Sequence, residues 1–150
     1  DLMTDAEKLG SKWDAGKIFK IIESTPGKKK VVAFASGAGT AEAVKAAHLL
    51  SKGESSYSMV IYNVHSLKPF DEAGTISAVN GADLVISVED HSVIGGLGSC
   101  VAETLAKLDH HPKLVKFGIQ DKFGESGEPD ELYDLHGLSG KMIAASINYA

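Results

Sequence analysis

Arginine is absent from this chain of 150 residues, and all of its fifteen basic residues are lysines. Sites that hold sugar phosphates usually include arginine, because its planar guanidinium group pairs with two phosphate oxygens at once. The absence suggests that any phosphate-binding group lies on another chain or domain. The net charge of −5 argues in addition against nucleic acid as the main partner, because binding to phosphates needs a basic surface.

Cysteine is almost absent too. The single Cys100 excludes an internal disulfide, which favours a reducing, cytoplasmic compartment. No apolar run reaches the roughly 18 residues of a membrane-spanning helix, and the acidic, polar start lacks the pattern of a secretion signal. Histidine and cysteine do not occur in the HxH, HExxH or CxxC spacings of common metal sites, so we expect no metal on this chain.

Strand-like and helix-like segments alternate along the chain, and 43% of its residues are apolar. Short runs of small and β-branched residues predict strands at 17–22, 31–36, 57–64, 82–89 and 113–119. Apolar residues at helical spacing, together with Pro, Gly and acidic starts, predict helices at 40–51, 69–80, 95–108, 129–135 and 139–148.

This alternation predicts a three-layer α/β/α fold with a five-stranded mixed sheet. The first two strands are joined by a short turn at 24–27, so we expect them to form a hairpin, with the first strand antiparallel to the others. Residues 1–16 show no clear periodicity and are interpreted as an N-terminal linker with one helical turn at 4–9. Residues 17–150 then form one domain.

A glycine-containing turn follows the second predicted strand and begins a helix. Its candidate anion-binding residues are Ser36, Gly37, Gly39 and Thr40. The backbone N–H groups of such a turn and the positive end of the helix favour a negative ligand. The pattern is only half of a dinucleotide fingerprint, because Glu42 stands where the third glycine should be. A purely structural turn is the stronger interpretation.

A second cluster stands at the end of the predicted strand 82–89. Its candidate residues are Glu89, Asp90, His91, Gly95, Gly96, Gly98 and Ser99. A histidine beside two carboxylates could act as an acid or base. The stronger interpretation is structural: His91 and its neighbours stabilise a surface loop or a subunit contact. A third segment, 121–132, contains two glycines and Pro129, and reads as a connecting loop.

Several motifs in series resemble one known family. Residues 89–106 read EDHSVIGGLGSCVAETLA, 115–132 read VKFGIQDKFGESGEPDEL, 36–50 read SGAGTAEAVKAAHLL, 63–78 read NVHSLKPFDEAGTISA, and 137–147 read GLSGKMIAASI. In this order and spacing they look like the C-terminal domain of transketolases, particularly the form that is split into two subunits. The resemblance covers about residues 16–147. The departures are Lys122, where the family often has arginine, and the longer polar lead-in.

The resemblance implies ketol transfer between sugar phosphates, with thiamine diphosphate and a divalent metal (Mg) in the full enzyme. In the family the cofactor lies between two other domains at a dimer interface, one of which carries a Gly-Asp-Gly…Asn motif. This sequence has no Gly-Asp pair, so no catalytic residue transfers onto it, and we expect no cofactor on this chain alone. The implied role is architectural: the partners are the cofactor-binding domains or subunit, the full assembly is a homodimer, and the 89–99 loop lies near the interface and the substrate side.

Three alternatives stay open. The chain resembles the C-terminal domain of related thiamine diphosphate enzymes, namely deoxyxylulose phosphate synthase and the β subunits of 2-oxoacid dehydrogenases. The two helix N-termini could instead make it a stand-alone anion- or nucleotide-binding regulatory module. Finally, it could be an interaction domain that docks a carrier protein, as in those β subunits.

Overall fold

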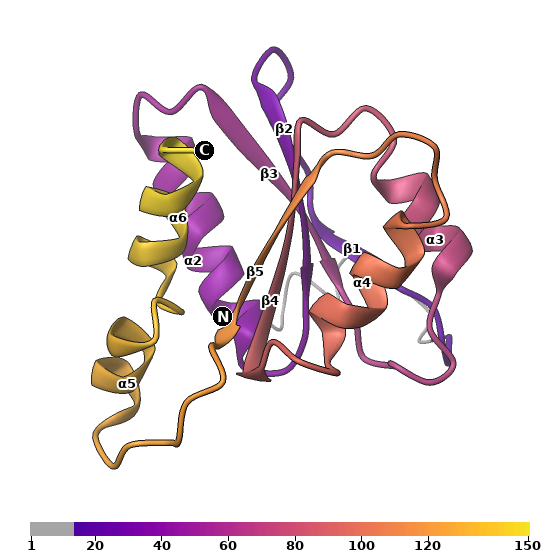
Figure 1. Ribbon diagram of the computed structural model, residues 1–150. Helices are drawn as coiled ribbons and strands as arrows, with labels where there is room; N and C mark the ends of the chain where they lie inside the picture. The colour runs from indigo at the N-terminus through magenta and orange to yellow at the C-terminus, as the bar shows by residue number, and fades with distance from the viewer. Residues whose placement is uncertain (1–13) are drawn as a thin grey trace.

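The computed structural model describes residues 14–150 as a five-stranded sheet between two layers of helices (Figure 1). The strands are β1 (Phe19–Ile22), β2 (Lys29–Ala35), β3 (Tyr57–Asn63), β4 (Leu84–Ser92) and β5 (Lys113–Ile119). The helices are α2 (Gly39–Lys52), α3 (Glu72–Ala78), α4 (Leu97–Leu105), α5 (Pro129–Leu135) and α6 (Gly140–Asn148). The helical turn expected at 4–9, and most of the linker, lie outside the described residues.

The strand order is β1-β3-β2-β4-β5, and only β1 runs antiparallel, against β3. The mixed three-layer fold and the antiparallel first strand are therefore confirmed. The predicted hairpin is wrong, because β3 lies between β1 and β2. The physical reason lies in burial: β2 is fully buried from Val31 to Ala35 and bonds a parallel neighbour on each side. The more polar β1, with Lys20 exposed, takes the sheet edge.

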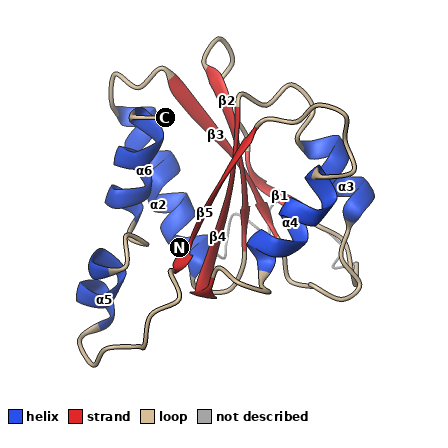
Figure 2. Cartoon of the chain, in the orientation of Figure 1, coloured by secondary structure: helices blue, strands red, loops and turns tan. Residues whose placement is uncertain are grey.

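Alternating side chains of β2 build the two halves of the core. Val31, Ala33 and Ala35 face α2 and α6 on one side. Val32 and Phe34 face the other side, which α3 and α4 cover. Figure 2 shows the two helical layers on opposite faces of the strands. Two-sided burial explains why this strand reads as a continuous apolar run.

Helix α6 begins where a carboxylate from another helix meets it. One oxygen of Glu42, in α2, accepts the backbone N–H of Gly140 at 2.8 Å, and its other oxygen accepts from Lys45. A side chain at Gly140 would press on Lys45 Cβ, at 2.5 Å, so glycine allows the close approach of α6 to α2. Glu42 thus ties the last helix to the first of the same layer.

Strand β4 extends to Ser92, three residues beyond the predicted end at 89. Its regular pairing with β5 shifts register after Val88 and resumes where Ser92 pairs with Ile119. Asp90 and His91 therefore lie within the strand, whereas the sequence placed them in a loop. Within residues 14–150, no helix has both the length and the apolar character that crossing a membrane requires.

Candidate functional site

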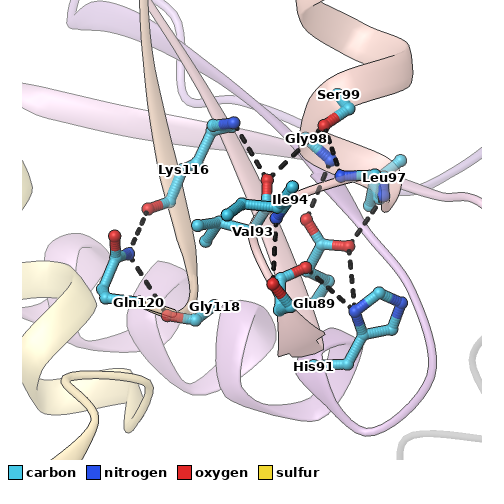
Figure 3. A network of polar contacts seen from close by, with 12 residues as sticks. Glu89, His91, Val93, Ile94, Leu97, Gly98, Ser99, Lys116, Gly118 and Gln120 are labelled. Atoms are coloured by element: carbon cyan, nitrogen blue, oxygen red, sulfur yellow. Dashed lines mark hydrogen bonds and ion pairs between the residues drawn. The ribbon is translucent and has the colours of Figure 1, made fainter. Parts of the chain in front are cut away.

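The parallel strands end at one edge of the sheet, and both candidate clusters lie there. Open α/β sheets usually bind ligands at this edge. The first cluster follows β2, and the second is formed by the end of β4 and the turn into α4. Figure 3 shows the second cluster, in which Glu89 points toward the start of α4 and His91 lies beside it.

The Glu89 side chain is buried and caps helix α4. One carboxylate oxygen accepts the N–H of Leu97 at 2.7 Å, and the other accepts the N–H of Gly98 at 2.9 Å. Only 1% of Glu89 is exposed. First-turn N–H groups have no partner within the helix, and a negative charge is favourable at this end. Glu89 therefore occupies the place that an anionic ligand of α4 would take.

Glycines make this cap possible. A Cβ at Gly96 would overlap the Glu89 carboxylate and approach His91 at 2.8 Å. A Cβ at Gly98 would lie 2.7 Å from Ser87 Oγ and 2.5 Å from a carbon of Lys116. Gly95 has a positive φ of 75°, a conformation that side chains disfavour. The run Gly95-Gly96-Leu97-Gly98 thus serves close packing around a buried carboxylate.

His91 lies on the surface, with 58% of its side chain exposed. Its Nδ1 is 2.9 Å from the carbonyl oxygen of Ser92 and 4.0 Å from Glu89 Oε2. A carbonyl oxygen only accepts, so Nδ1 is the donor in the contact with Ser92. Since both oxygens of Glu89 bond α4, they do not form a close catalytic pair with His91. The arrangement fits a surface contact better than acid–base catalysis.

Asp90 is exposed at the end of β4 and has a partner that the sequence did not reveal. Tyr133, in α5, lies near enough for its hydroxyl group to interact with this carboxylate. Burial, and then the nearby Asp90 carboxylate, raise the pKa of Tyr133 to about 12. This contact links the end of β4 to α5.

Ser99 and Lys116 hold the turn between β4 and α4. Ser99 Oγ accepts from Gly95 N at 2.9 Å, and Lys116 Nζ donates to the carbonyl of Val93 at 2.9 Å. The Gln120 side-chain amide donates to the Lys116 carbonyl at 3.5 Å and to the Gly118 carbonyl at 3.2 Å, along β5 (Figure 3). Lys116 and Gln120 were not among the predicted residues, and nothing in their spacing singles them out.

The first cluster is a tight turn between β2 and α2. The Ser36 N–H donates to the Val88 carbonyl at 3.1 Å, and the Thr40 N–H to the Gly37 carbonyl at 3.1 Å. Gly37 has a φ of 54°, and a Cβ at Gly39 would lie 2.9 Å from the Val88 carbonyl oxygen. Two of the four candidate N–H groups are therefore used inside the protein, and anion binding by this turn stays a prediction.

A cavity of about 830 Å³ lies between α2 and the β1–β3 edge of the sheet. Ile21, Val44 and Met59 give it an apolar wall, and Thr40 and Asn63 line its polar end. These last two bond each other, Thr40 Oγ1 donating to Asn63 Oδ1 at 3.1 Å. The cavity shares Gly37 and Thr40 with the first cluster.

The start of α4 does not fit the diphosphate group of thiamine diphosphate. The first-turn N–H groups of α4 are bonded to a carboxylate, whose charge would repel a diphosphate. In residues 14–150, no three His, Cys, Asp or Glu side chains gather where they could hold a metal ion.

Comparison with known proteins places the chain in a family. The model described as "Transketolase, C-terminal domain" matches residues 21–143. A "Putative transketolase C-terminal section" from Methanocaldococcus jannaschii is 42% identical over 114 residues, which are 76% of this chain and 34% of that protein. A 1-deoxy-D-xylulose-5-phosphate synthase from Caldanaerobacter subterraneus is 34% identical over 119 residues, 79% of this chain and 19% of that protein.

A solved structure gives the same result. A chain described as "Split gene transketolase, inactive beta4 tetramer" superposes with a TM-score of 0.81 at 33% identity, over 94% of this chain and 44% of that one. A transketolase from Pichia stipitis matches at 19% identity with a TM-score of 0.62, which shows the fold alone. This chain therefore spans less than half the length of each of these relatives.

Proposed function

Because this chain belongs to the transketolase C-terminal domain family, we propose that it is the C-terminal part of a transketolase that transfers ketol units between sugar phosphates. The full enzyme uses thiamine diphosphate and Mg²⁺, held by domains other than this one. It works in the cytoplasm, in the pentose phosphate pathway. Within it, this domain acts in architecture, dimer assembly and regulation rather than in cofactor binding.

The observation that carries the proposal is the likeness to the split-gene transketolase chain, at 33% identity over 94% of this chain. The TM-score of 0.81 over that length means that the two chains share the fold. This chain matches only 44% of that chain's length, so the rest of the relative has no counterpart here. We infer that the missing portion belongs to the partner domains or subunit, and that the full assembly is a homodimer.

The proposed contact region is the segment 89–99, which comprises the end of β4, the turn after it and the start of α4, and which is called the 89–99 loop below. Its cap on α4 and the Lys116 bond to Val93 hold the backbone of this loop in one shape. His91 and Ile94 remain exposed on it, Ile94 by 63%. Glu89 is buried, so it supports this contact by positioning the loop and not by touching a partner.

The test is reconstitution. The chain is mixed with the separately purified polypeptide that carries the cofactor-binding domains, and the transfer of a ketol unit between sugar phosphates is followed. We expect activity only from the mixture with thiamine diphosphate and Mg²⁺ present. Transfer by this chain alone would overturn the architectural role, and an inactive stable mixture would overturn the assignment as a transketolase.

A second candidate is the C-terminal domain of a 1-deoxy-D-xylulose-5-phosphate synthase. The 34% identity with such a synthase over 79% of this chain favours it. The same reconstituted mixture distinguishes the two. Formation of 1-deoxy-D-xylulose 5-phosphate without ketol transfer between sugar phosphates would select the synthase.

A stand-alone anion-binding module is less favoured, because Glu89 already fills the N-terminus of α4.

A further inference from the structure

The connection between β5 and α5 is an exposed segment with an aromatic side chain in the open. Every residue from Gln120 to Glu131 is exposed, and Phe123 is 100% exposed. In Figure 1 this segment runs away from the sheet and lies outside the three layers. Large exposed apolar side chains grouped with polar residues are typical of contact surfaces.

The segment is anchored at its ends and free between them. At its start, the Asp121 N–H donates to the Ile119 carbonyl at 3.1 Å. At its far end, α5 is held by the contact of Tyr133 with Asp90. Among the residues that the structure describes, none forms a hydrogen bond or ion pair with residues 122–127. Phe123 is therefore presented by a short strap and not by a packed element.

A second exposed apolar side chain, Ile94, lies near the start of the strap. The Val93 N–H donates to the Ile119 carbonyl at 3.1 Å, which brings the 89–99 loop beside the start of the strap. The next residue, Ile94, is 63% exposed. The proposed contact loop and the strap therefore meet at the end of β5.

The strap is strongly acidic. The strap, residues 120–128, and the first residues of α5, 129–131, together include five acidic side chains and one lysine. We define the Phe123 surface by its apolar and acidic members. They are Ile94, Phe123, Asp121, Glu125, Glu128, Asp130 and Glu131.

We propose that the Phe123 surface docks onto a basic protein surface on the cofactor-binding part of the enzyme, with Phe123 in an apolar pocket rimmed by arginine or lysine. This inference rests on the proposed function and names the contact that joins the two parts. The negative charge of the strap favours a basic partner. A second copy of this chain would bring two acidic straps together, whereas a basic rim is complementary to the strap in charge. Charge also excludes nucleic acid as the occupant.

The test measures the affinity of this chain for the purified cofactor-binding polypeptide by calorimetry, at low and high salt. Phe123→Ala should weaken binding at least about tenfold, as expected for an aromatic anchor. The matched control is Tyr149→Ala, because Tyr149 is also largely exposed, at 92%. It follows α6, at the opposite end of the α2–α5–α6 layer from the strap (Figure 1). The control variant should leave the affinity unchanged. Since Phe123 has no packing to lose, the melting temperature of Phe123→Ala should equal that of the wild type.

Charge is tested separately. The double variant Glu125→Gln/Glu128→Gln should weaken binding and reduce its dependence on salt, because fewer ion pairs form with the rim. Glu54→Gln, at an exposed acid between α2 and β3, should change neither quantity.

The outcomes separate this inference from the proposed function. If the wild type binds and Phe123→Ala binds equally well, the docking surface is wrong and the proposed function stands. If the wild type does not bind the cofactor-binding polypeptide at all, both fail. If sedimentation shows a dimer of this chain alone that Phe123→Ala dissociates, the occupant is a second copy and the proposal is overturned.

Discussion

The Glu89 carboxylate lies 2.7 Å from the backbone nitrogen of Leu97, the first residue of α4. The Glu89 carboxylate, near the end of β4, thus takes the place of the anionic ligand that a glycine-rich strand-to-helix turn suggests. The same arrangement recurs in the other helical layer, where Glu42 accepts from Gly140. Buried carboxylates therefore fix where two helices begin.

Removing the Glu89 side chain should destabilise the domain markedly. Glu89→Ala leaves the N–H groups of Leu97 and Gly98 buried without an acceptor, which costs about 2–4 kcal/mol in free energy of unfolding. Glu89→Gln keeps one acceptor and should cost about 1–2 kcal/mol. Urea denaturation of the three proteins measures the order. Equal stability of Glu89→Ala and wild type would show that the bonds contribute nothing.

A methyl group at position 96 should disturb the same cap by steric means. The Cβ of Gly96→Ala would overlap the Glu89 carboxylate, so we expect a loss of about 2–3 kcal/mol. Gly124→Ala is the matched control, because nothing lies within 4 Å of a Cβ there. It should change the unfolding free energy by less than about 0.5 kcal/mol. A loss of similar size in both variants would point to backbone effects instead of the clash.

The pattern of apolar residues predicted the elements and the layers because burial on two faces leaves a clear mark in sequence. The run from Val31 to Ala35 is an example. The sequence did not reveal where β1 lies in the sheet. A short connection between β1 and β2 allows β1 to pair either with β2 or with the strand beyond it. The apolar β2 is stable only in the interior of the sheet, with a strand on each side, so β1 pairs at the edge of the sheet instead.

The sequence marked Glu89 and the glycines after it as candidate residues, but it did not predict that Glu89 bonds the start of α4. Glycines at 95, 96 and 98 suggested a ligand, yet Gly96 makes room for Glu89, and Gly98 makes room for Ser87 and Lys116. An acid shortly before a glycine-rich helix start is a usable signal for such an internal cap. The contact of Tyr133 with Asp90 had no signal, because it joins segments that only the tertiary fold brings together.

Acid should weaken the start of α3 through Asp71. Burial raises the pKa of Asp71, but hydrogen bonds from Gly74, Ile18 and Lys17 outweigh it, so the pKa lies below its ordinary 3.8. A lowered pKa contributes stability that is present above the ordinary value and is lost as pH falls through the lowered one. Asp71→Asn removes this contribution, about 1–2 kcal/mol at neutral pH.

Urea unfolding of wild type and Asp71→Asn between neutral pH and acid checks this. The stability gap between the two proteins should be constant above the ordinary pKa and shrink below it. Asp109→Asn, at an exposed residue after α4, should show no gap at neutral pH. A gap that is independent of pH would assign the Asp71 effect to packing.

Alkali should reveal the contact of Tyr133 with Asp90. The pKa of Tyr133 is raised to about 12, first by burial and then by Asp90. A raised pKa means that the contribution to stability is complete below the ordinary value of 10.0 and is lost as pH rises toward 12. Asp90→Asn should lower the pKa of Tyr133 but leave it above 10.0, because burial remains. Tyrosinate absorbance, with Tyr133→Phe identifying the late step, measures both values. If Asp90→Asn left that step unchanged, Asp90 would make no contribution to the raised pKa of Tyr133.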